Sequence, residues 1–475
     1  MLRVSPNRLL VTALLLWGSL VVPAGAHPTG YEGYTVVRIQ VSGITDLAAL
    51  GELLSDPADF ELWSEALGLG SMEVRVSPAG MPLLDAAGLR YEVVLADLQQ
   101  YIDKLYGLHD ERRDETFFAN LRTYDEHVQF MQDLVASHPG LAQMISLGDS
   151  VDGRPLWAMR ITGPAGDKPG VMYHGAEHGN EQATASVVAY AADYLLTNYG
   201  SDTQATALVD DVEWFLLPIM NPDGYENYER FNAHGVDLNR NWGGPGSGED
   251  PNGGPYPFSE PETQEMRDFY VSHPNVRMHI DFHGYARWLM WPWNHTPLLC
   301  PDHRTFRRLC ESAYNRLAAV GGGHYRLGSA YNVSYAVSGG SMGYVYGELG
   351  IWSFTFELRD LPVPTICEHF LPTMLYLSGW INDCNDNGIP DAVDLADGTS
   401  FDTNGDHVPD ECECIADIDN SGSVGIADLL AQLSHYGTPD GAGFEEGDLD
   451  RDWDVDLSDL ASLLAVYGNV CPPAQ

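Results

Sequence analysis

Short apolar segments alternate with segments of helical periodicity across residues 114–382, and this alternation limits the possible folds most strongly. The apolar segments are GVMYH, VEWFLLPIMNP, VRMHIDFHG and WSFTFEL, and the helical ones include TYDEHVQFMQDLVASH and EQATASVVAYAADYLLTNYG. Buried parallel strands read as continuous apolar runs, because helices cover both faces of such a sheet. The pattern predicts an α/β domain with a mixed, mostly parallel sheet flanked by helices. Functional loops are then expected at the carboxyl ends of the strands.

The N-terminus has the features of a secretory signal. Arg3 and Arg8 precede an apolar run at 9–22, and small residues at 24–26 suit a signal peptidase. Residues 1–26 are therefore predicted to be a signal peptide, and the protein is expected to be secreted into the extracellular space. No later run approaches the roughly 18 apolar residues that a membrane-spanning helix needs, so no membrane span is expected.

The chain is strongly acidic, and the acidity is concentrated near its C-terminus. The formal net charge of the 475 residues is -44. From Asp383 onward there are 22 acidic residues and one basic residue, Arg451, which leaves -21 for this part. Such a charge argues against nucleic acid or an anionic membrane as a partner. It fits either a solvated extension or a cation-binding module.

Seven cysteines would meet an oxidising environment in a secreted protein. Proximity in the sequence suggests three pairs: Cys300/Cys310, Cys384/Cys412 and Cys414/Cys471. An odd number leaves one thiol over, which would be Cys367.

Residues 27–113 are predicted to form a small α+β unit. Residues 34–41 and 72–78 have the composition of strands, whereas ITDLAALGELL and residues 92–105 have helical periodicity. The unit ends at a dibasic step, Arg112-Arg113, in a polar stretch. It could be a structural domain or a propeptide that is cleaved near that step.

Residues 383–475 contain two kinds of acidic repeat. DCNDNGIPD (383–391) and DTNGDHVPD (402–410) share one template, which marks 383–414 as acidic calcium-binding repeats. In 415–475 a unit of an acidic loop followed by an amphipathic helix recurs after 31 residues. The units resemble dockerin modules, and the shorter pair resembles thrombospondin type 3 repeats. These resemblances imply a cell-surface or extracellular partner for the tail.

Each longer repeat offers oxygen ligands at loop positions that suit calcium. The candidate ligands are Asp417, Asp419, Ser421 and Asp428 in the first loop, and Asp448, Asp450, Asp452 and Asp459 in the second. The first loop has Gly422 at the position of the sharp turn, whereas the second has Trp453 there. Calcium is therefore the predicted ion, and a solvated acidic surface is the alternative.

The segment YHGAEHGNEQ (173–182) contains two overlapping patterns typical of metal ligands. From His174 it matches H-x-x-E-H, and from the second histidine it matches H-x-x-E. The first pattern needs a continuous helix, but Gly175 and Gly179 would each destabilise a helix by about 1 kcal/mol. The first reading is therefore disfavoured.

The second reading fits a turn from a strand into a helix. The apolar strand GVMYH precedes the segment, and the helix is expected to begin near Asn180 or Glu181. A turn of this kind can direct His178 and Glu181 toward one point. The sequence therefore favours His178 and Glu181 as ligands over His174 and Glu177.

A catalytic zinc site with an open position needs a third protein ligand. VRMHIDFHG offers His279 near its start and His283 at its polar end. His283 is the better candidate because it lies at the expected functional edge, and His279 is expected to be a buried core residue.

With these residues the chain resembles a zinc metallocarboxypeptidase of the carboxypeptidase A/B type. The motifs, in chain order, are HGNE (178–181), MNPDGY (220–225), RFNAHGVDLNRNW (230–242), DFHGY (281–285) and SYAVSGGSMGYVYGELGIWSFTFELRD (334–360). The resemblance covers roughly 115–382, and 27–113 is similar to the activation propeptide of the family. Carboxypeptidase A is itself a standard example of a zinc site with two histidines and one glutamate, so the resemblance implies His178, Glu181 and His283 as zinc ligands.

The resemblance also implies a role for each further motif residue. Glu357 would act as the general base, with a structural ion pair to Arg359 as the alternative, and Arg230 would stabilise the developing oxyanion. The residues that would bind the substrate are Asn239, Arg240, Tyr335 and Met342. Asn239, Arg240 and Tyr335 would hold the terminal carboxylate, and Met342 would form an apolar floor for the departing side chain.

The sequence therefore predicts a secreted zymogen whose zinc peptidase removes C-terminal residues, preferably large hydrophobic or aromatic ones. A carboxypeptidase specific for basic residues and a peptidoglycan peptide hydrolase are alternatives among enzymes. An adhesion or scaffold protein with an inactive peptidase fold is the alternative outside them.

Overall fold

The computed structural model describes most of residues 28–382 and part of the tail. The described residues are 28, 30–64, 67–107, 116–164, 168–247, 250–382, 399–400, 416–419, 421, 423–439, 441–443, 446–449 and 453–468. Several sequence predictions lie outside them: the signal peptide, the dibasic step, the repeats at 383–391 and 402–410, Gly422, Asp450, Asp452, and the cysteines at 384, 412, 414 and 471.

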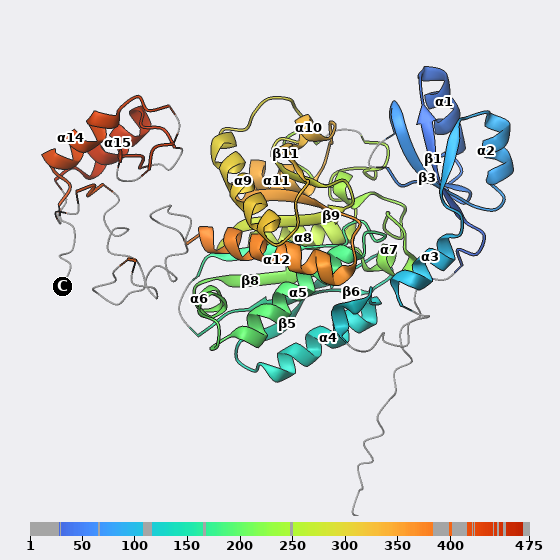
Figure 1. Cartoon of the computed structure of the whole chain (residues 1–475), viewed down its shortest axis with the longest axis horizontal. Coiled ribbons are helices and arrows are strands. Elements are labelled where there is room, and N and C mark those ends of the chain that lie inside the picture. Colours follow the sequence, from blue (N-terminus) through green and yellow to red (C-terminus); the bar gives the residue numbers. More distant parts are fainter. Residues whose placement is uncertain are drawn as a thin grey trace, which may run out of the picture.

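Residues 30–107 contain a four-stranded antiparallel sheet with its own core (Figure 1). The sheet order is β2-β3-β1-β4, from β1 (Thr35–Val41), β2 (Phe60–Leu62), β3 (Gly70–Val76) and β4 (Tyr91–Leu95). Helices α1 (Ile44–Leu53) and α2 (Met81–Ala87) bury Leu50 and Leu84 against Val37, Ile39 and Val74 of the strands. Helix α3 (Leu98–Leu105) follows and packs into the core of the larger domain.

The prediction of one helix over 92–105 is only half right. Residues Tyr91–Leu95 form β4, which pairs with β1, and the helix begins after Asp97. The Asp97 side chain accepts the backbone N–H of Gln100, so an N-cap separates the two elements. The short strand β2 and helix α2 were also not predicted.

The larger domain is built on an eight-stranded mixed sheet. Its order is β11-β10-β12-β9-β7-β8-β6-β5. The strands are β5 (Ala142–Asp149), β6 (Pro155–Ile161), β7 (Gly170–His174), β8 (Glu213–Leu217), β9 (Val276–Gly284), β10 (Trp288–Trp291), β11 (Arg326–Ser329) and β12 (Trp352–Leu358). The central strands β12, β9, β7 and β8 are parallel, whereas β5, β6 and the β10–β12 pair are antiparallel. The predicted mixed α/β fold is confirmed.

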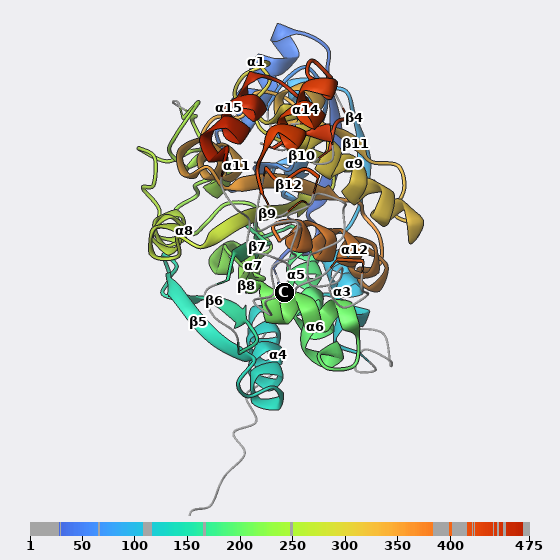
Figure 2. The ribbon, with the colours of Figure 1, turned by 90° about the vertical axis from the view of Figure 1, so that its left-hand side faces the viewer.

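Helices cover both faces of this sheet (Figure 2). Those of the larger domain are α4 (Tyr124–Ser137), α5 (Ala183–Asn198), α6 (Thr203–Asp211), α7 (Pro222–Asn227), α8 (Pro261–Ser272), α9 (His303–Ala319), α10 (Ala330–Val333), α11 (Ser341–Leu349) and α12 (Val363–Trp380). Helices α5, α9 and α12 share one core, and α8 and α11 belong to a second core on the other side.

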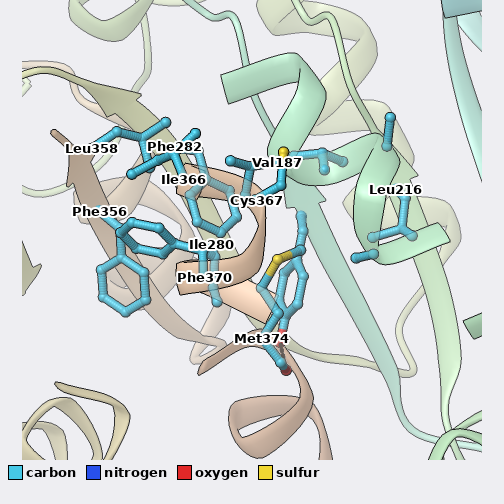
Figure 3. Packing of buried hydrophobic residues seen from close by; sticks show 14 of the residues in the cluster. Val187, Leu216, Ile280, Phe282, Phe356, Leu358, Ile366, Cys367, Phe370 and Met374 are labelled. Carbon is cyan, nitrogen blue, oxygen red and sulfur yellow. Dashed lines mark hydrogen bonds between the residues drawn. The ribbon is translucent and has the colours of Figure 1, made fainter. Parts of the chain in front are cut away.

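The two faces of β9 differ in chemistry, and this difference positions the site. Ile280 and Phe282 point into the apolar core, where Phe282 packs against Phe356 and Phe370 (Figure 3). Side chains alternate along a strand, so His279, Asp281 and His283 lie on the opposite face. One face of the strand therefore anchors the sheet, and the other carries polar groups.

The described part of the tail contains α14 (Ile426–His435) and α15 (Leu457–Val466). Ala416, Ile418, Val424 and Leu463 form a small core between the repeats. Arg304 of α9 makes an ion pair with Asp454, with 2.9 Å between Nη1 and Oδ2. No helix in the described ranges is long and apolar enough to cross a membrane.

The suggested Cys300/Cys310 disulfide is wrong. Both are buried free thiols, as is Cys367. Cys310 lies within α9 in the hydrophobic core with Phe306, Leu309 and Ala313, where burial raises the pKa of its thiol. Closeness in sequence does not bring two sulfur atoms together when one is committed to the buried face of a helix.

Candidate active site

The turn between β7 and α5 places His178 and Glu181 in one buried corner. The chain leaves β7 at His174, and helix α5 begins at Ala183, slightly later than predicted. Gly179 lies against the backbone of α7, where a Cβ would collide with the carbonyl carbon of Gly224. Only glycine permits this approach, so the turn is locked by packing.

His178, Glu181 and His283 converge at the carboxyl end of the sheet. His178 Nδ1 lies 2.9 Å from Glu181 Oε1 and 3.0 Å from His283 Nδ1, and His283 Nδ1 lies 3.0 Å from Glu181 Oε2. All three side chains are buried. The structure thus brings together the three residues that the sequence selected.

This arrangement fits zinc. Tetrahedral zinc with bonds of about 2.0–2.1 Å holds neighbouring ligand atoms about 3.3 Å apart, close to the separations seen. Two imidazole nitrogens and one carboxylate are the ligand set of a catalytic site with one open position. Glu181 also accepts the backbone N–H of Gly284 at 3.0 Å, which restrains its carboxylate.

A buried carboxylate stands behind each histidine. Asp237 Oδ1 lies 3.1 Å from His178 Nε2, and Asp281 Oδ2 lies 2.8 Å from His283 Nε2. Both histidines therefore turn Nδ1 toward the shared corner. Burial acts against ionisation of Asp237, but Arg230 and Arg240 hold its pKa well below the usual value.

The same environment affects the proton on His178. Burial and Arg230 oppose protonation, but Glu181 and Asp237 together raise the pKa of His178 to about 9. A metal ion that binds there below this pH must displace a proton, so metal affinity should rise with pH.

The predicted substrate residues line one pocket beside the metal cluster. Asn239, Arg240, Tyr335, Met342 and Glu357 surround a cavity of about 40 Å³ together with His283. The pocket is completed by Trp288, Met290, Asn294, Ala330, Ser334, Val337 and Thr355. Arg240 Nη2 donates to the Tyr335 hydroxyl at 3.2 Å, so these two lining residues contact each other directly.

Glu357 lies on β12 directly opposite His283 on β9. The two strands are parallel, so both side chains point to the same face. Glu357 Oε2 accepts the backbone N–H of Ala286 at 3.2 Å, whereas Arg359 donates to the carbonyl of Gly323 at 3.1 Å. Glu357 therefore lines the pocket beside His283.

Arg230 is also buried at the cluster. Its Nε and Nη2 each lie 3.0 Å from Asp237 Oδ2, and Nη1 lies 3.7 Å from Glu181 Oε1. Asp237 thus holds the guanidinium beside the corner where the metal ligands meet. A fixed cation there can stabilise negative charge that develops on a substrate.

The tail contains two further groups of carboxylates. Asp417, Asp419 and Asp428 lie close together in the first loop, and Ser421 donates to Asp417 Oδ1 at 3.3 Å. In the second loop the grouped residues are Asp454, Asp456 and Asp459, of which only Asp459 was predicted. Trp453 adopts a φ of 73°, so it makes the left-handed turn that the sequence pattern assigns to glycine.

Sequence reasoning missed two carboxylates of the site, Asp237 and Asp281, and considered Glu177 only as an alternative metal ligand. Asp237 and Asp281 stand inside motifs already selected, two residues before Asn239 and two before His283. An acidic residue at i−2 of a strand histidine lies on the same face, which is a usable signal. Glu177 accepts the indole N–H of Trp242 at 2.8 Å, a contact that only the fold creates.

The fold and the site together define a metallopeptidase built on a mixed α/β sheet. The family model described as zinc carboxypeptidase matches residues 127–375, which is more than half of the chain. The chain therefore belongs to the zinc carboxypeptidase family, and it is a zinc-dependent peptide hydrolase.

Curated relatives agree with this assignment. Carboxypeptidase A2 of Mus musculus is 31% identical over 335 residues, which cover 64% of this chain and 80% of that protein. Carboxypeptidase A1 of Bos taurus is 28% identical over 414 residues, which cover 78% of this chain and 99% of that protein. The relatives are carboxypeptidases of the A type, so carboxypeptidase activity follows for this chain.

Solved structures support the same fold. The crystal structure of thrombin activatable fibrinolysis inhibitor superposes with a TM-score of 0.65 at 19% identity, covering 74% of this chain and 99% of that one. Carboxypeptidase A from Helicoverpa armigera gives 0.61 at 21% identity, covering 74% and 96%. At these identities the similarity concerns the fold alone.

Proposed function

We propose that this chain is a secreted zymogen whose zinc carboxypeptidase releases large apolar residues from peptide C-termini. The observation that carries the proposal is the meeting of two groups of residues in one place. The metal cluster of His178, Glu181 and His283 lies beside a pocket that contains Arg240 and Glu357. A carboxylate-binding cation next to a hydrolytic centre suits a peptide with a free C-terminus.

Each residue then has a defined task. Arg240, with Asn239 and Tyr335, binds the terminal carboxylate and aligns the last peptide bond with the metal corner. Bound zinc supplies a Lewis acid for carbonyl polarisation and water activation. Glu357 takes a proton from the attacking water and delivers it to the leaving amine. Arg230 donates hydrogen bonds to the oxyanion that develops on the carbonyl oxygen.

The lining of the pocket favours apolar side chains. Met342 packs in a cluster with Met290, Ala330 and Val333, and Trp288 lies against it. Glu357 is the only acidic residue among the described residues that line the pocket. A C-terminal Lys or Arg would therefore lack a counter-charge at the floor, which disfavours the basic-specific alternative.

An inhibitory role for residues 27–113 is supported by contacts at the site. Glu61 Oε1 lies 3.3 Å from the backbone nitrogen of Arg230, and the Tyr106 hydroxyl donates to Gln182 at 2.6 Å. Trp63 lies near Tyr228 with the two rings tilted by 59° and their centroids 6.2 Å apart. This unit would restrict access to the metal corner until cleavage near the dibasic step releases it.

The acidic tail is proposed to bind calcium outside the catalytic domain. The grouped carboxylates of the first loop, Asp417, Asp419 and Asp428, offer hard oxygen ligands. Calcium would order the paired helices and present them to an extracellular or cell-surface partner.

One experiment tests the proposal. The full chain would be treated with trypsin, which cleaves after basic residues, and offered blocked dipeptides that end in Phe, Leu, Lys or Arg. Fast release of Phe and Leu, abolished by a zinc chelator and restored by zinc, is expected. Inactivity of the processed, zinc-loaded protein toward all four would contradict the proposed function and would favour an inactive scaffold.

A further inference from the structure

A row of polar side chains lies beneath the metal corner on the face of the sheet opposite the apolar core. His279, Asp281 and His283 follow each other along β9, and all three are buried. Burying polar groups is costly unless each one finds a partner. The partners of this row therefore indicate what it does.

The row continues onto the neighbouring strands. Ser353 Oγ lies 2.7 Å from His279 Nδ1, and His279 Nε2 lies 2.9 Å from His174 Nε2. His174 Nδ1 lies 3.5 Å from Asp281 Oδ1, which is the longest step. The Nδ1 of His174 and the Oδ1 of Asp281 make no hydrogen bond among the described residues. The hydrogen-bonded part of the row therefore runs from Ser353 through His279 to His174 and stops short of Asp281.

Asp281 receives further donors on its other oxygen. Ser341 Oγ donates to Asp281 Oδ2 at 2.6 Å, and His283 Nε2 lies 2.8 Å from the same atom. Glu177 Oε2 lies 3.4 Å from His283 Nε2 as a second, more distant carboxylate. The orientation of Asp281 is therefore set by Ser341, independently of His283.

The Asn239 amide competes with Asp281 for contact with the Nε2 atom of His283. Asn239 Nδ2 lies 2.9 Å from His283 Nε2, while its Oδ1 accepts the backbone N–H of Ser341. If the amide donated to Nε2, the proton of a neutral His283 would sit on Nδ1, the atom that faces Glu181. Asp281 requires the opposite tautomer, with the proton on Nε2 and a free lone pair on Nδ1.

We propose that Asp281 is a positioning residue that keeps the proton of His283 on Nε2 and so leaves Nδ1 free to bind zinc. The inference rests on the proposed function, in which His283 is a zinc ligand. Ser341 acts one step further back, because its hydroxyl holds the carboxylate of Asp281. A carboxylate behind a metal-bound imidazole raises its basicity and fixes its ring.

The test is the zinc affinity of Asp281→Asn in the full chain, measured by competition with a chromogenic chelator. The substitution keeps the shape of the side chain and removes its charge. We expect zinc binding to weaken by about 10- to 100-fold, the range typical of removing such a partner. The visible absorption spectrum of the cobalt-substituted variant should also shift, because the ligand field of His283 changes.

Ser353→Ala is the matched control. It removes a buried hydrogen bond from the far end of the row without touching Asp281, so it should lower the melting temperature and leave zinc affinity unchanged. If both variants lost zinc affinity equally, the effect would be general loosening of the core and the inference would be wrong. If Asp281→Asn fails to fold, Ser341→Ala takes its place, because it frees the carboxylate but keeps the charge. Weaker zinc binding by Ser341→Ala supports the inference, and unchanged binding overturns it.

Failure of the inference can be distinguished from failure of the proposed function. A wild-type chain that binds no zinc would overturn both. A wild-type chain with one zinc and an Asp281→Asn variant with the same affinity and cobalt spectrum would overturn the inference alone.

Discussion

Glu357 and His283 occupy the same level of two neighbouring parallel strands, β12 and β9. This pairing places a carboxylate beside a candidate metal ligand and at the wall of the substrate pocket. Burying a carboxylate in so apolar a strand costs free energy. The pairing of Glu357 with His283 suggests a functional reason for this cost, because it places the carboxylate next to the metal cluster. The proposed general base and the proposed metal site are fixed to each other by the sheet itself.

Replacing this base should separate chemistry from binding. In Glu357→Gln we expect kcat to fall by about 10³-fold or more, because proton transfer and water activation are both impaired. Zinc content and melting temperature should stay as in the wild type. The control is Glu348→Gln, which makes the same substitution at an exposed glutamate of α11 and should keep full activity. A Gln variant at 357 with near wild-type turnover would remove Glu357 from the mechanism.

Substitution of Met342 should change specificity. The wild-type enzyme is expected to prefer C-terminal Phe, Tyr, Trp, Leu or Met over Lys and Arg by at least about 10-fold, since each modest apolar contact contributes about 1–3 kcal/mol. Met342→Asp should erode this preference and raise kcat/KM for basic termini, because it adds the missing counter-charge. Met342→Leu conserves the volume and should retain the preference. Faster release of Lys or Arg than of Phe by the wild type would show that another acid serves the pocket.

Removal of the tail should leave catalysis intact. A chain that ends at residue 382 retains all strands of the sheet and every proposed catalytic residue, so it should fold and cleave peptides. Calcium should raise the melting temperature of the separate segment 415–475, and Asp419→Asn should reduce this rise. Loss of peptidase activity in a truncated chain that is still folded would contradict the independence of the two parts.

Acid should destabilise the protein partly through His127. This residue is buried in α4, and neither ring nitrogen has a hydrogen-bond partner among the residues that the structure describes. Burial, with a smaller effect from Arg122, lowers its pKa from 6.5 to about 3. The unfolded chain therefore binds a proton that the folded chain does not. The stabilisation is complete above pH 6.5 and is lost as the pH falls toward 3.

Urea unfolding of the zinc-free chain at several pH values checks this prediction. His127→Phe should show a shallower loss of unfolding free energy on acidification, by up to about 1.4 kcal/mol per pH unit. Phenylalanine should be accommodated because His127 already packs edge-to-face against Phe117, with ring centroids 5.2 Å apart. An unchanged pH dependence in the variant would show that His127 does not titrate in this range.

The sequence alone could predict elements whose pattern is local. The strand β7, the turn after it and the helix α5 were predictable because an apolar run, two glycines and a run of small residues follow one another. Residues 92–95 were predicted as helix, because the pairing of β4 with β1 joins positions more than fifty residues apart and leaves no local signal. The further motif residues of the site were assigned through the resemblance to zinc carboxypeptidases.

The buried partners of the site depend on strand register, which the sequence does not contain. His279 could be assigned to the core, but its contacts with His174 and Ser353 arise from β7 and β12 on either side of β9. Asp237 and Asp281 each lie in a motif with a candidate residue. Only the structure shows that their carboxylates contact the Nε2 atoms of the two histidines of the metal cluster. The predicted Cys300/Cys310 disulfide was wrong for the same reason. It was inferred from closeness in the sequence, which does not determine where two side chains lie in the fold.

The most direct test of the account is the zinc content of two matched variants, Glu181→Gln and Glu177→Gln, beside the wild type. Glu177 and Glu181 lie in the same turn. Only the Glu181 carboxylate contacts the Nδ1 atoms of both His178 and His283. After equilibration with one equivalent of zinc and removal of free metal, we predict one zinc per chain in the wild type and in Glu177→Gln, and little or none in Glu181→Gln. Zinc retained by Glu181→Gln and lost by Glu177→Gln would contradict the assignment of the metal site.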